Sequence, residues 1–297
     1  MPNKMQQYSQ LVSDTMQRIA SSPSQWAAFL STAANNYKYS YPDQLMIFAQ
    51  KPEATACADF VFWNKRMHRS INAGTSGIAL FDANSDYSRM RYVFDIADTS
   101  PRKNAVPVQL WSMSDEHRQT VHQSLSDRFG IPSEHFTLED QMARTAVKLT
   151  SDFWNANRTY FEERIPAKQA KSFYDTAVSS VIFSLYMRCG TKINPRDFHT
   201  FETVSTLNPQ AVTALGATVS NVSSQMLRTI EAAIRKYEQE RTQEHERDNQ
   251  QSEPQPSAGQ VRQTAPELSS GDQSAAVLRN AAEREPVSTP VPDRGTG

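Results

Sequence analysis

The sequence predicts an α+β fold: N-terminal helices with a small antiparallel sheet, followed by an all-helical region and a disordered C-terminal tail. Three observations lead to this prediction. Apolar residues recur at helical spacing in the first 50 residues, short apolar runs broken by turn residues follow between residues 69 and 97, and helical spacing returns after residue 114. Helices and a sheet in separate stretches of one chain are typical of the α+β class.

Three helices are expected before the sheet. Residues 5–20 form the first, because they carry apolar side chains at helical spacing at Leu11, Val12, Met16 and Ile19. The sequence Ser-Pro-Ser at 22–24 interrupts it, and Ser24 is the expected N-cap of a second helix over residues 25–35. Pro42, in a first turn, begins a third helix that ends at residue 50, before Pro52. A short helix is expected over residues 59–66.

Three strands are expected next, over residues 69–73, 77–82 and 90–97. The link between the first two contains Gly74 and Gly77. Glycine adopts positive φ angles without a steric penalty, so this link is predicted to be a tight hairpin. A polar turn at residues 84–86 leads into the third strand.

The helical region is predicted from periodicity and from the residues that end helices. Helices are expected over residues 114–129, 138–160, 167–188, 209–215 and 216–239. Gly130 should end the first of them and Gly190 the third, since glycine is favoured just after a helix C-terminus. Gly216 is expected to mark the start of the last, long amphipathic helix.

Composition divides the chain into three parts: an α+β domain over residues 1–110, a helical extension packed on it over residues 111–239, and a linker or tail over residues 240–297. Residues 1–110 contain 11 Lys and Arg against 8 Asp and Glu, a balance of +3, whereas residues 240–297 contain 6 against 10, a balance of −4. No aromatic residue follows Tyr237 in 60 positions. Such a segment cannot bury enough apolar surface to offset its ordering entropy, so the tail is predicted to be disordered.

Several classes of function are not indicated. The two cysteines, Cys57 and Cys189, make neither a disulfide framework nor a zinc site. The zinc motif H-E-x-x-H is absent, and its nearest approach, HERDN at 245–249, lacks the second histidine. There is no phosphate loop of the G-x-x-x-x-G-K-[ST] kind and no G-x-S-x-G turn. We therefore expect no enzyme activity, catalytic residue, metal or cofactor in this chain.

The same composition bears on location. No apolar run approaches the ~20 residues that span a membrane, and the first ten residues, MPNKMQQYSQ, have no apolar signal core. We expect no membrane association, no secretion and a cytoplasmic location.

The stretch from Trp26 to Asp82 mixes aromatic and basic side chains. Its aromatic residues include Tyr37, Tyr39, Tyr41, Phe48, Phe60, Phe62 and Trp63. Its basic residues include Lys38, Lys51, Lys65, Arg66 and Arg69. Stacking faces interleaved with cations suit a protein that holds single-stranded nucleic acid without reading its sequence. The other interpretation, which composition favours for any one ring, places most of these rings in the core.

Ordered motifs run through much of the chain: YPDQLMIFAQ at 41–50, PEATACA at 52–58, WNKRMHR at 63–69, GTSGIALFD at 74–82, RYVFDIADT at 91–99, VQLWSM at 108–113, SSVIFSLYMRCG at 179–190, and residues 215–230. They resemble the N-terminal single-stranded-DNA-binding domain of ArdC-like antirestriction proteins, in the version that opens large helicase- and methylase-containing proteins of conjugative elements in Firmicutes. The resemblance covers about 210 of the 297 residues. It implies that the tail links this domain to further domains, so the chain is either the leading piece of a longer polypeptide or a shortened copy.

The resemblance implies sequence-tolerant binding of single-stranded DNA in a protein of a conjugative or other mobile element. Tyr37 and Trp63 would stack on bases, and Lys65, Arg66 and Arg69 would contact phosphates. Other conjugation or DNA-processing proteins are further expected partners.

Four more residues complete the implied groove. Gln44 and Asn64 would donate hydrogen bonds to sugar or base edges. Gly74 and Gly77 would let the DNA backbone approach closely, because glycine has no side chain to block it.

The chain also departs from the resembling domains. They usually carry glycine where this chain has His68, and they tend to carry basic residues at the positions of Asn72, Ala73 and Ser76. Up to three positive charges are therefore missing, which predicts weaker and less salt-sensitive binding. This loss leaves open an alternative function, a protein-interaction or scaffold module. In that module the aromatic residues are core, residues 114–239 present a docking face and DNA binding is vestigial.

Overall fold

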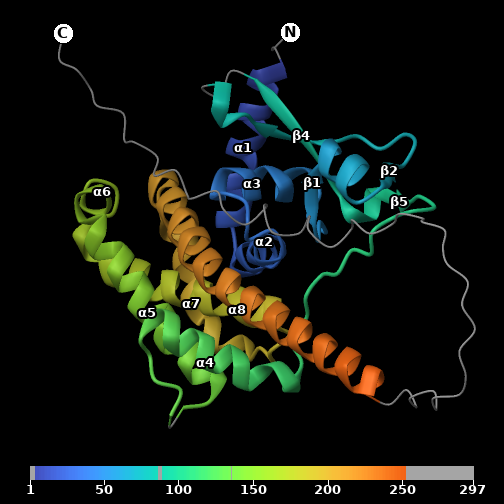
Figure 1. Ribbon diagram of the computed structural model, residues 1–297. Coiled ribbons are helices and arrows are strands. Elements are labelled where there is room, and N and C mark those ends of the chain that lie inside the picture. Colours follow the sequence, from blue (N-terminus) through green and yellow to red (C-terminus); the bar gives the residue numbers. More distant parts are fainter. Residues whose placement is uncertain (1–3, 86–88, 135, 252–297) are drawn as a thin grey trace, which may run out of the picture. The chain divides into compact units, whose positions relative to one another are not determined.

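The computed structural model describes residues 4–85, 89–134 and 136–251 (Figure 1). In this part of the chain three helices come first, two small antiparallel sheets follow, and the rest is helical, which confirms the predicted α+β class. Elements up to residue 101 are α1 (Lys4–Ala20), α2 (Pro23–Asn35), α3 (Tyr41–Gln50), β1 (Cys57–Asp59), η1 (Phe62–Arg66), β2 (Arg69–Ile71), β3 (Ile78–Phe81), η2 (Ala83–Ser85), β4 (Met90–Asp95), η3 (Ile96–Asp98) and β5 (Thr99–Pro101).

The second half is built from helices of different lengths. They are η4 (Asp115–His117), α4 (Arg118–Phe129), α5 (Leu138–Ala156), α6 (Arg158–Glu162), η5 (Ala167–Gln169), α7 (Ala170–Cys189), η6 (Pro195–Thr206) and α8 (Pro209–Gln251). Residues up to Asn249 form one compact unit. Among the described residues, no helix combines the length and the apolar character needed to cross a membrane.

The start of α2 differs from the prediction. Ser22, not Ser24, is the N-cap, and its hydroxyl oxygen accepts a hydrogen bond from the Gln25 backbone nitrogen at 3.3 Å. Pro23 takes the first helical position, where its fixed φ and missing N–H suit the first turn. The cap therefore lies one residue before the proline.

The three predicted strands exist, but the predicted hairpin is wrong. β3 pairs antiparallel with β4, and β4 pairs with β1, giving the order β1-β4-β3; β2 pairs instead with β5 in a separate two-stranded sheet (Figure 1). β3 buries Ile78 and Leu80, whereas the residues of β2 are only partly buried. The Asn72 backbone nitrogen also donates to the Asp98 carbonyl at 2.9 Å, which directs the chain after β2 toward β5.

The free edge of β3 is closed by a side chain. Gln50, the last residue of α3, donates from its amide nitrogen to the Ala79 carbonyl at 2.8 Å. Its amide oxygen accepts from the Ala79 backbone nitrogen at 2.9 Å. The glutamine amide thus makes the two bonds that a neighbouring strand would make, and it fixes α3 against the sheet.

The short helix predicted over residues 59–66 is present over residues 60–66, and only its first residue belongs to another element. Asp59 ends β1, and η1 (Phe62–Arg66) is a π-helix, in which the Met67 backbone nitrogen donates to the Phe62 carbonyl at 3.0 Å. The Asp59 carboxylate accepts from the Phe62 backbone nitrogen at 2.6 Å and so caps this turn. π-Helical turns are rare and occur frequently at functional sites.

Helix ends in the second half follow the sequence signals in part. α4 ends at Gly130 and α7 at Gly190, with φ of 71° and 70°, which confirms both predicted stops. The predicted helix over residues 138–160 is interrupted at Asn157. There the side-chain amide donates to the Phe153 carbonyl at 2.8 Å and competes with the helical backbone bonds.

α8 is one continuous helix, so the predicted break at Gly216 is wrong. A Cβ atom added at Gly216 would lie 2.0 Å from the ring of Tyr41, which shows that this glycine is required for close packing of α8 on α3. The helix also continues past its predicted end at residue 239 to Gln251, assisted by pairs such as Lys236 with Glu240 and Arg241 with Glu116. The predicted disorder of residues 252–297 lies outside the described residues.

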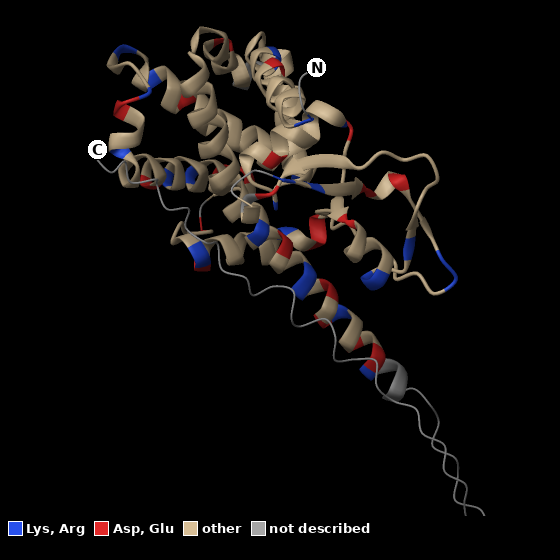
Figure 2. Ribbon diagram, turned by 90° about the horizontal axis from the view of Figure 1, so that it is seen from above, with Lys and Arg blue, Asp and Glu red and all other residues tan. Residues whose placement is uncertain are grey.

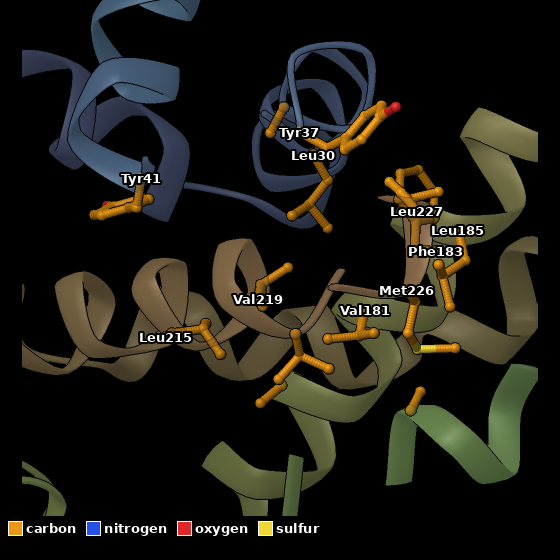
Figure 3. Close-up of a cluster of buried hydrophobic side chains, with 14 of the residues drawn as sticks. Leu30, Tyr37, Tyr41, Val181, Phe183, Leu185, Leu215, Val219, Met226 and Leu227 are labelled. Atoms are coloured by element: carbon orange, nitrogen blue, oxygen red, sulfur yellow. The ribbon is translucent and has the colours of Figure 1, made fainter. Parts of the chain in front are cut away.

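One hydrophobic core joins the N-terminal helices to the helical half. Figure 3 shows Leu30 and Tyr41 facing Leu215 and Val219 of α8. The indole nitrogen of Trp26 donates to the Ser180 hydroxyl at 2.9 Å across 154 residues of sequence. Packing therefore does not divide at residue 110, and the helical half is part of the same core as α2 and α3.

Candidate nucleic-acid interface

Three of the nine predicted binding residues are buried. Tyr37, Gln44 and Trp63 are 3%, 2% and 1% exposed. Gln44 donates to the Asn36 carbonyl at 3.3 Å, and the Trp63 indole nitrogen donates to the Phe94 carbonyl at 2.8 Å. Their predicted roles in stacking and in base contacts are wrong, because none of them presents a free surface to a ligand.

Tyr37 instead belongs to a buried polar network. Its hydroxyl donates to the Glu231 carboxylate at 2.5 Å and accepts from the Trp111 indole nitrogen at 3.0 Å. Lys38 and Arg235 pair with the same carboxylate at 2.7 and 2.9 Å. Burial, followed by the bond to Glu231, raises the pKa of Tyr37 above its usual range. This network holds α8 to the segment after α2.

The predicted cations lie in a different environment. Lys65 and Arg66 are exposed at the end of η1, and Asn64 beside them is partly buried. Arg69 is also partly buried, and its guanidinium group donates to the hydroxyl and the carbonyl of Thr99 at 2.7 and 2.9 Å. Lys65 and Arg66 are thus accessible to a ligand. The Arg69 guanidinium group is held by Thr99 of β5, and only its N–H groups that do not bond Thr99 are available to a phosphate.

Two further cations join them through strand pairing. The Arg102 backbone nitrogen donates to the His68 carbonyl at 3.1 Å, and the Val106 nitrogen donates to the Met67 carbonyl at 3.1 Å. These bonds place Arg102 and Lys103, both exposed, beside β2. These two cations were not predicted from the sequence, because their proximity to β2 depends on β5, a strand that was not predicted. The sequence signal that could have found them is the absence of Asp and Glu from residues 60–73 and 99–107, both of which contain Lys and Arg.

We call residues 60–73 and 99–107 the basic lobe. It contains five Lys and Arg residues and no Asp or Glu, a charge of +5, and Figure 2 shows blue positions on this part of the structure. In the described chain none of these five cations forms an ion pair with a carboxylate, whereas Lys51 and Arg91, outside the lobe, pair with Asp98 and Asp43 at 2.6 and 2.7 Å. The lobe is a cluster of positive charge without internal compensation.

The two predicted glycines differ. Gly74 is exposed, has φ of 80° and has no atom within 4 Å of an added Cβ, so it serves an open turn next to the lobe. Gly77 is crowded, because an added Cβ would lie 3.0 Å from the ring of Phe94. Its missing side chain makes room for Phe94, and its predicted role in admitting DNA stays a prediction.

A strained residue lies at the centre of the lobe. Among the described residues, His68 is the non-glycine residue with positive φ, at 50°. Its carbonyl accepts the bond from Arg102 that joins the two segments of the lobe. Left-handed conformations are unfavourable for residues with a Cβ atom, and such strain often accompanies functional sites.

Other reactive groups do not form a site in the described residues. Burial raises the pKa of the Cys57 and Cys189 thiols to about 12, so both are weakly nucleophilic at neutral pH. The described residues contain no group of three His, Cys, Asp or Glu side chains placed to hold a metal ion. Comparisons of the chain with protein-family models, curated proteins and solved structures find no match.

Proposed function

We propose that this chain binds single-stranded DNA with little sequence preference, through the basic lobe, as an ArdC-like module of a mobile-element protein in the cytoplasm. The observation that carries the proposal is the lobe's five cations, none of which forms an ion pair with a carboxylate in the described part of the chain. Phosphate contacts supply most of the affinity of sequence-tolerant binding. The remainder of the chain carries a net negative charge, since the whole chain has −1, so the lobe is where phosphate groups should be attracted most strongly.

The backbone at position 68 supports the resemblance on which the mobile-element assignment rests. Domains of that kind usually carry glycine there, and in this chain the position has φ of 50°. Glycine adopts this conformation without a steric penalty. If an ancestral glycine at this position were replaced by histidine, the backbone would keep the conformation that the glycine had. The positive φ of His68 is therefore expected of such a domain.

The test is a fluorescence-polarisation titration with a labelled dT oligomer and with a duplex of equal length, at 50 and 200 mM salt. Single strands give a salt slope of about 0.7 per phosphate contact, so five contacts predict a slope of about 3.5 for the dT oligomer. Two double variants remove two cations each: one combines Lys65→Gln with Arg66→Gln, and the other combines Arg102→Gln with Lys103→Gln. Each should weaken binding and reduce the salt slope by about 1.4. The duplex should bind less tightly.

The matched control removes the same charge elsewhere. Arg158 and Lys168 are exposed on the helical half, so Arg158→Gln, Lys168→Gln should leave both the affinity and the slope unchanged. Equal losses in this control and in the lobe variants would show that binding depends on overall charge, and the lobe would no longer be the binding site.

A second function is favoured by one observation, the burial of Tyr37 and Trp63 together with the exposure of Phe60 and Val61, at 51% and 53%. Exposed apolar side chains beside a charged surface suit a protein partner, such as another conjugation or DNA-processing protein. Failure of both oligomers to bind at 50 mM salt would replace DNA binding by this protein-interaction function.

A further inference from the structure

We propose that the outer face of the three-stranded sheet is the platform on which the unpaired bases of the bound strand stack, with Tyr92 and Phe94 as its rings and Phe60 at its edge. This inference rests on the proposed function and names the side chains that meet the bases. It replaces the stacking residues that the structure shows to be buried.

Strand register places these rings on one face. In β4, Val93 lies opposite Ile78 of β3 and belongs to the buried cluster with Met46 and Ile47. Side chains alternate between the faces of a strand, so Tyr92 and Phe94 point to the opposite face. Tyr92 is 38% exposed and Phe94 is partly exposed.

Phe94 is held in position by its neighbours. Its ring lies against Gly77, where an added Cβ atom would come within 3.0 Å of it. Its carbonyl accepts the hydrogen bond from the buried Trp63 indole at 2.8 Å. A ring fixed in this way loses little conformational entropy when a base stacks on it.

The platform adjoins the basic lobe. Ala58 of β1 pairs with Phe94, and Phe60 follows two residues later, at the first position of the lobe. Lys65 and Arg66 come at the end of the π-helix that follows. A strand whose bases meet the sheet would therefore have its phosphates near these cations, which is the charge complementarity that single-stranded DNA requires.

A further cation contacts Tyr92 itself. The Lys4 ammonium group donates to the Tyr92 hydroxyl at 2.5 Å and lies 5.1 Å from the centroid of its ring. The described chain thus supplies cations to the platform from α1 as well as from the π-helix that follows β1. Antiparallel sheets that bind single-stranded nucleic acid use aromatic residues on an open face in the same way.

The experiment compares two ligands, a labelled dT oligomer and an abasic oligomer with the same number of phosphates, in polarisation titrations of the full chain. The variants are Tyr92→Ala and Phe60→Ala, each checked for its fold by circular dichroism. Loss of one base–ring contact should raise the Kd for dT by roughly 5- to 150-fold. The Kd for the abasic oligomer and the salt slope should stay the same, because neither variant removes a cation or a phosphate.

Tyr160→Ala is the matched control. Tyr160 is 37% exposed and has an Arg164 guanidinium 4.0 Å from its ring centroid, so it resembles Tyr92 in exposure and in having a cationic neighbour, but it lies on α6. This variant should bind dT as the unchanged protein does.

The outcomes separate the two proposals. Unchanged dT affinity in Tyr92→Ala and Phe60→Ala, with weakened binding in the Lys65→Gln, Arg66→Gln variant, would overturn the platform and leave DNA binding by the lobe intact. Absence of binding by the unchanged protein would overturn both. Equal losses for dT and abasic oligomers in Tyr92→Ala would also overturn the platform, because the loss would then not depend on bases.

Discussion

The conformation of His68 has a consequence that single substitutions can measure. For a residue with a Cβ atom, the left-handed helical conformation is higher in free energy than the right-handed conformation by roughly 1–2 kcal/mol. His68 has φ of 50° and is exposed, so its side chain contributes little packing to offset this difference.

We predict that His68→Gly raises the free energy of unfolding by about 0.5–1 kcal/mol, since relief of the strain exceeds the added entropy of an unfolded glycine. Urea denaturation followed by circular dichroism measures it. Gly74→Ala is the opposite test, because Gly74 has φ of 80° with open space around it. This variant should have a free energy of unfolding lower by about 1 kcal/mol, through backbone strain alone. A destabilised His68→Gly would mean that the histidine side chain makes a stabilising contact.

At the scale of single residues, the sequence predicted exposed cations better than exposed rings. Lys65 and Arg66 are accessible, as expected, because burying a charge without a partner is strongly unfavourable. Tyr37 and Trp63 are buried because of partners far along the chain, such as Glu231, which lies 194 residues from Tyr37. Periodicity around an aromatic residue gives no information about such partners.

Between elements, the contact of α3 with α8 depends on one missing methyl group. The Tyr41 ring occupies the space that a side chain at position 216 would need, 2.0 Å from an added Cβ. Gly216→Ala should therefore lower the free energy of unfolding by about 2 kcal/mol. Overpacking accounts for about 3 kcal/mol of loss, and the higher helix propensity of alanine offsets about 1 kcal/mol of it.

A double-mutant cycle separates these two effects. In a Tyr41→Ala background the clash is absent, so adding Gly216→Ala should stabilise the protein by about 1 kcal/mol through helix propensity alone. If Gly216→Ala changed the free energy of unfolding with the same sign in both backgrounds, the packing role of this glycine would be contradicted. Both are read from denaturation midpoints at constant m-value.

The contact of α8 with the segment after α2 depends on charge. Burial by itself would raise the pKa of Glu231, but hydrogen bonds from Lys38 and Tyr37 and the charge of Lys38 outweigh it, so the pKa is lowered. A carboxyl group with a lowered folded-state pKa adds stability above its unfolded pKa of about 4.5, and this stability is lost as the pH falls through the folded value.

Glu231→Gln should lower the free energy of unfolding by about 2–3 kcal/mol at pH 7, because Lys38 and Arg235 lose a shared charged partner. The difference from the unchanged protein should shrink as the pH falls below about 4.5. Thermal denaturation between pH 3 and pH 7 measures this. Glu163→Gln, in the surface pair with Arg164, is the control and should change stability by less than 1 kcal/mol. A stability difference for Glu231→Gln that does not change with pH would show that the charge of the Glu231 carboxylate does not stabilise the folded protein.

Across the whole molecule, the last part of α8 extends beyond the core. Side chains from Glu238 to Arg247 are exposed, while Leu227, Ile230 and Ile234 are fully buried. A chain that ends at residue 239 should keep its free energy of unfolding within about 1 kcal/mol, since it loses only surface ion pairs. A chain that ends at residue 226 should show no cooperative urea transition. Cooperative folding of the shorter chain would show that α8 is not part of the core.

Local patterns predicted most elements of the fold but not how they pair. The strands at 69–73 and 77–82 were placed correctly, and their pairing with each other was wrong because β5 competes for β2 through Thr99 and Ser100. The helix break predicted at Gly216 does not occur, because the glycine is there to make room for Tyr41. Three of the five cations of the basic lobe were predicted, and Arg102 and Lys103 were missed because, like the pairing of β2, their place in the lobe depends on β5.

The Gln50 amide at the edge of β3 also bears on strand pairing between copies of this protein. An unpaired strand edge is a template for a strand of a second molecule, and such pairing leads to aggregation. At Ala79 both backbone groups are already bonded within the same molecule, by Gln50. A second copy would have to displace that amide before it added a strand here. The chain can therefore reach high local concentrations on a shared ligand without joining its sheets through this edge.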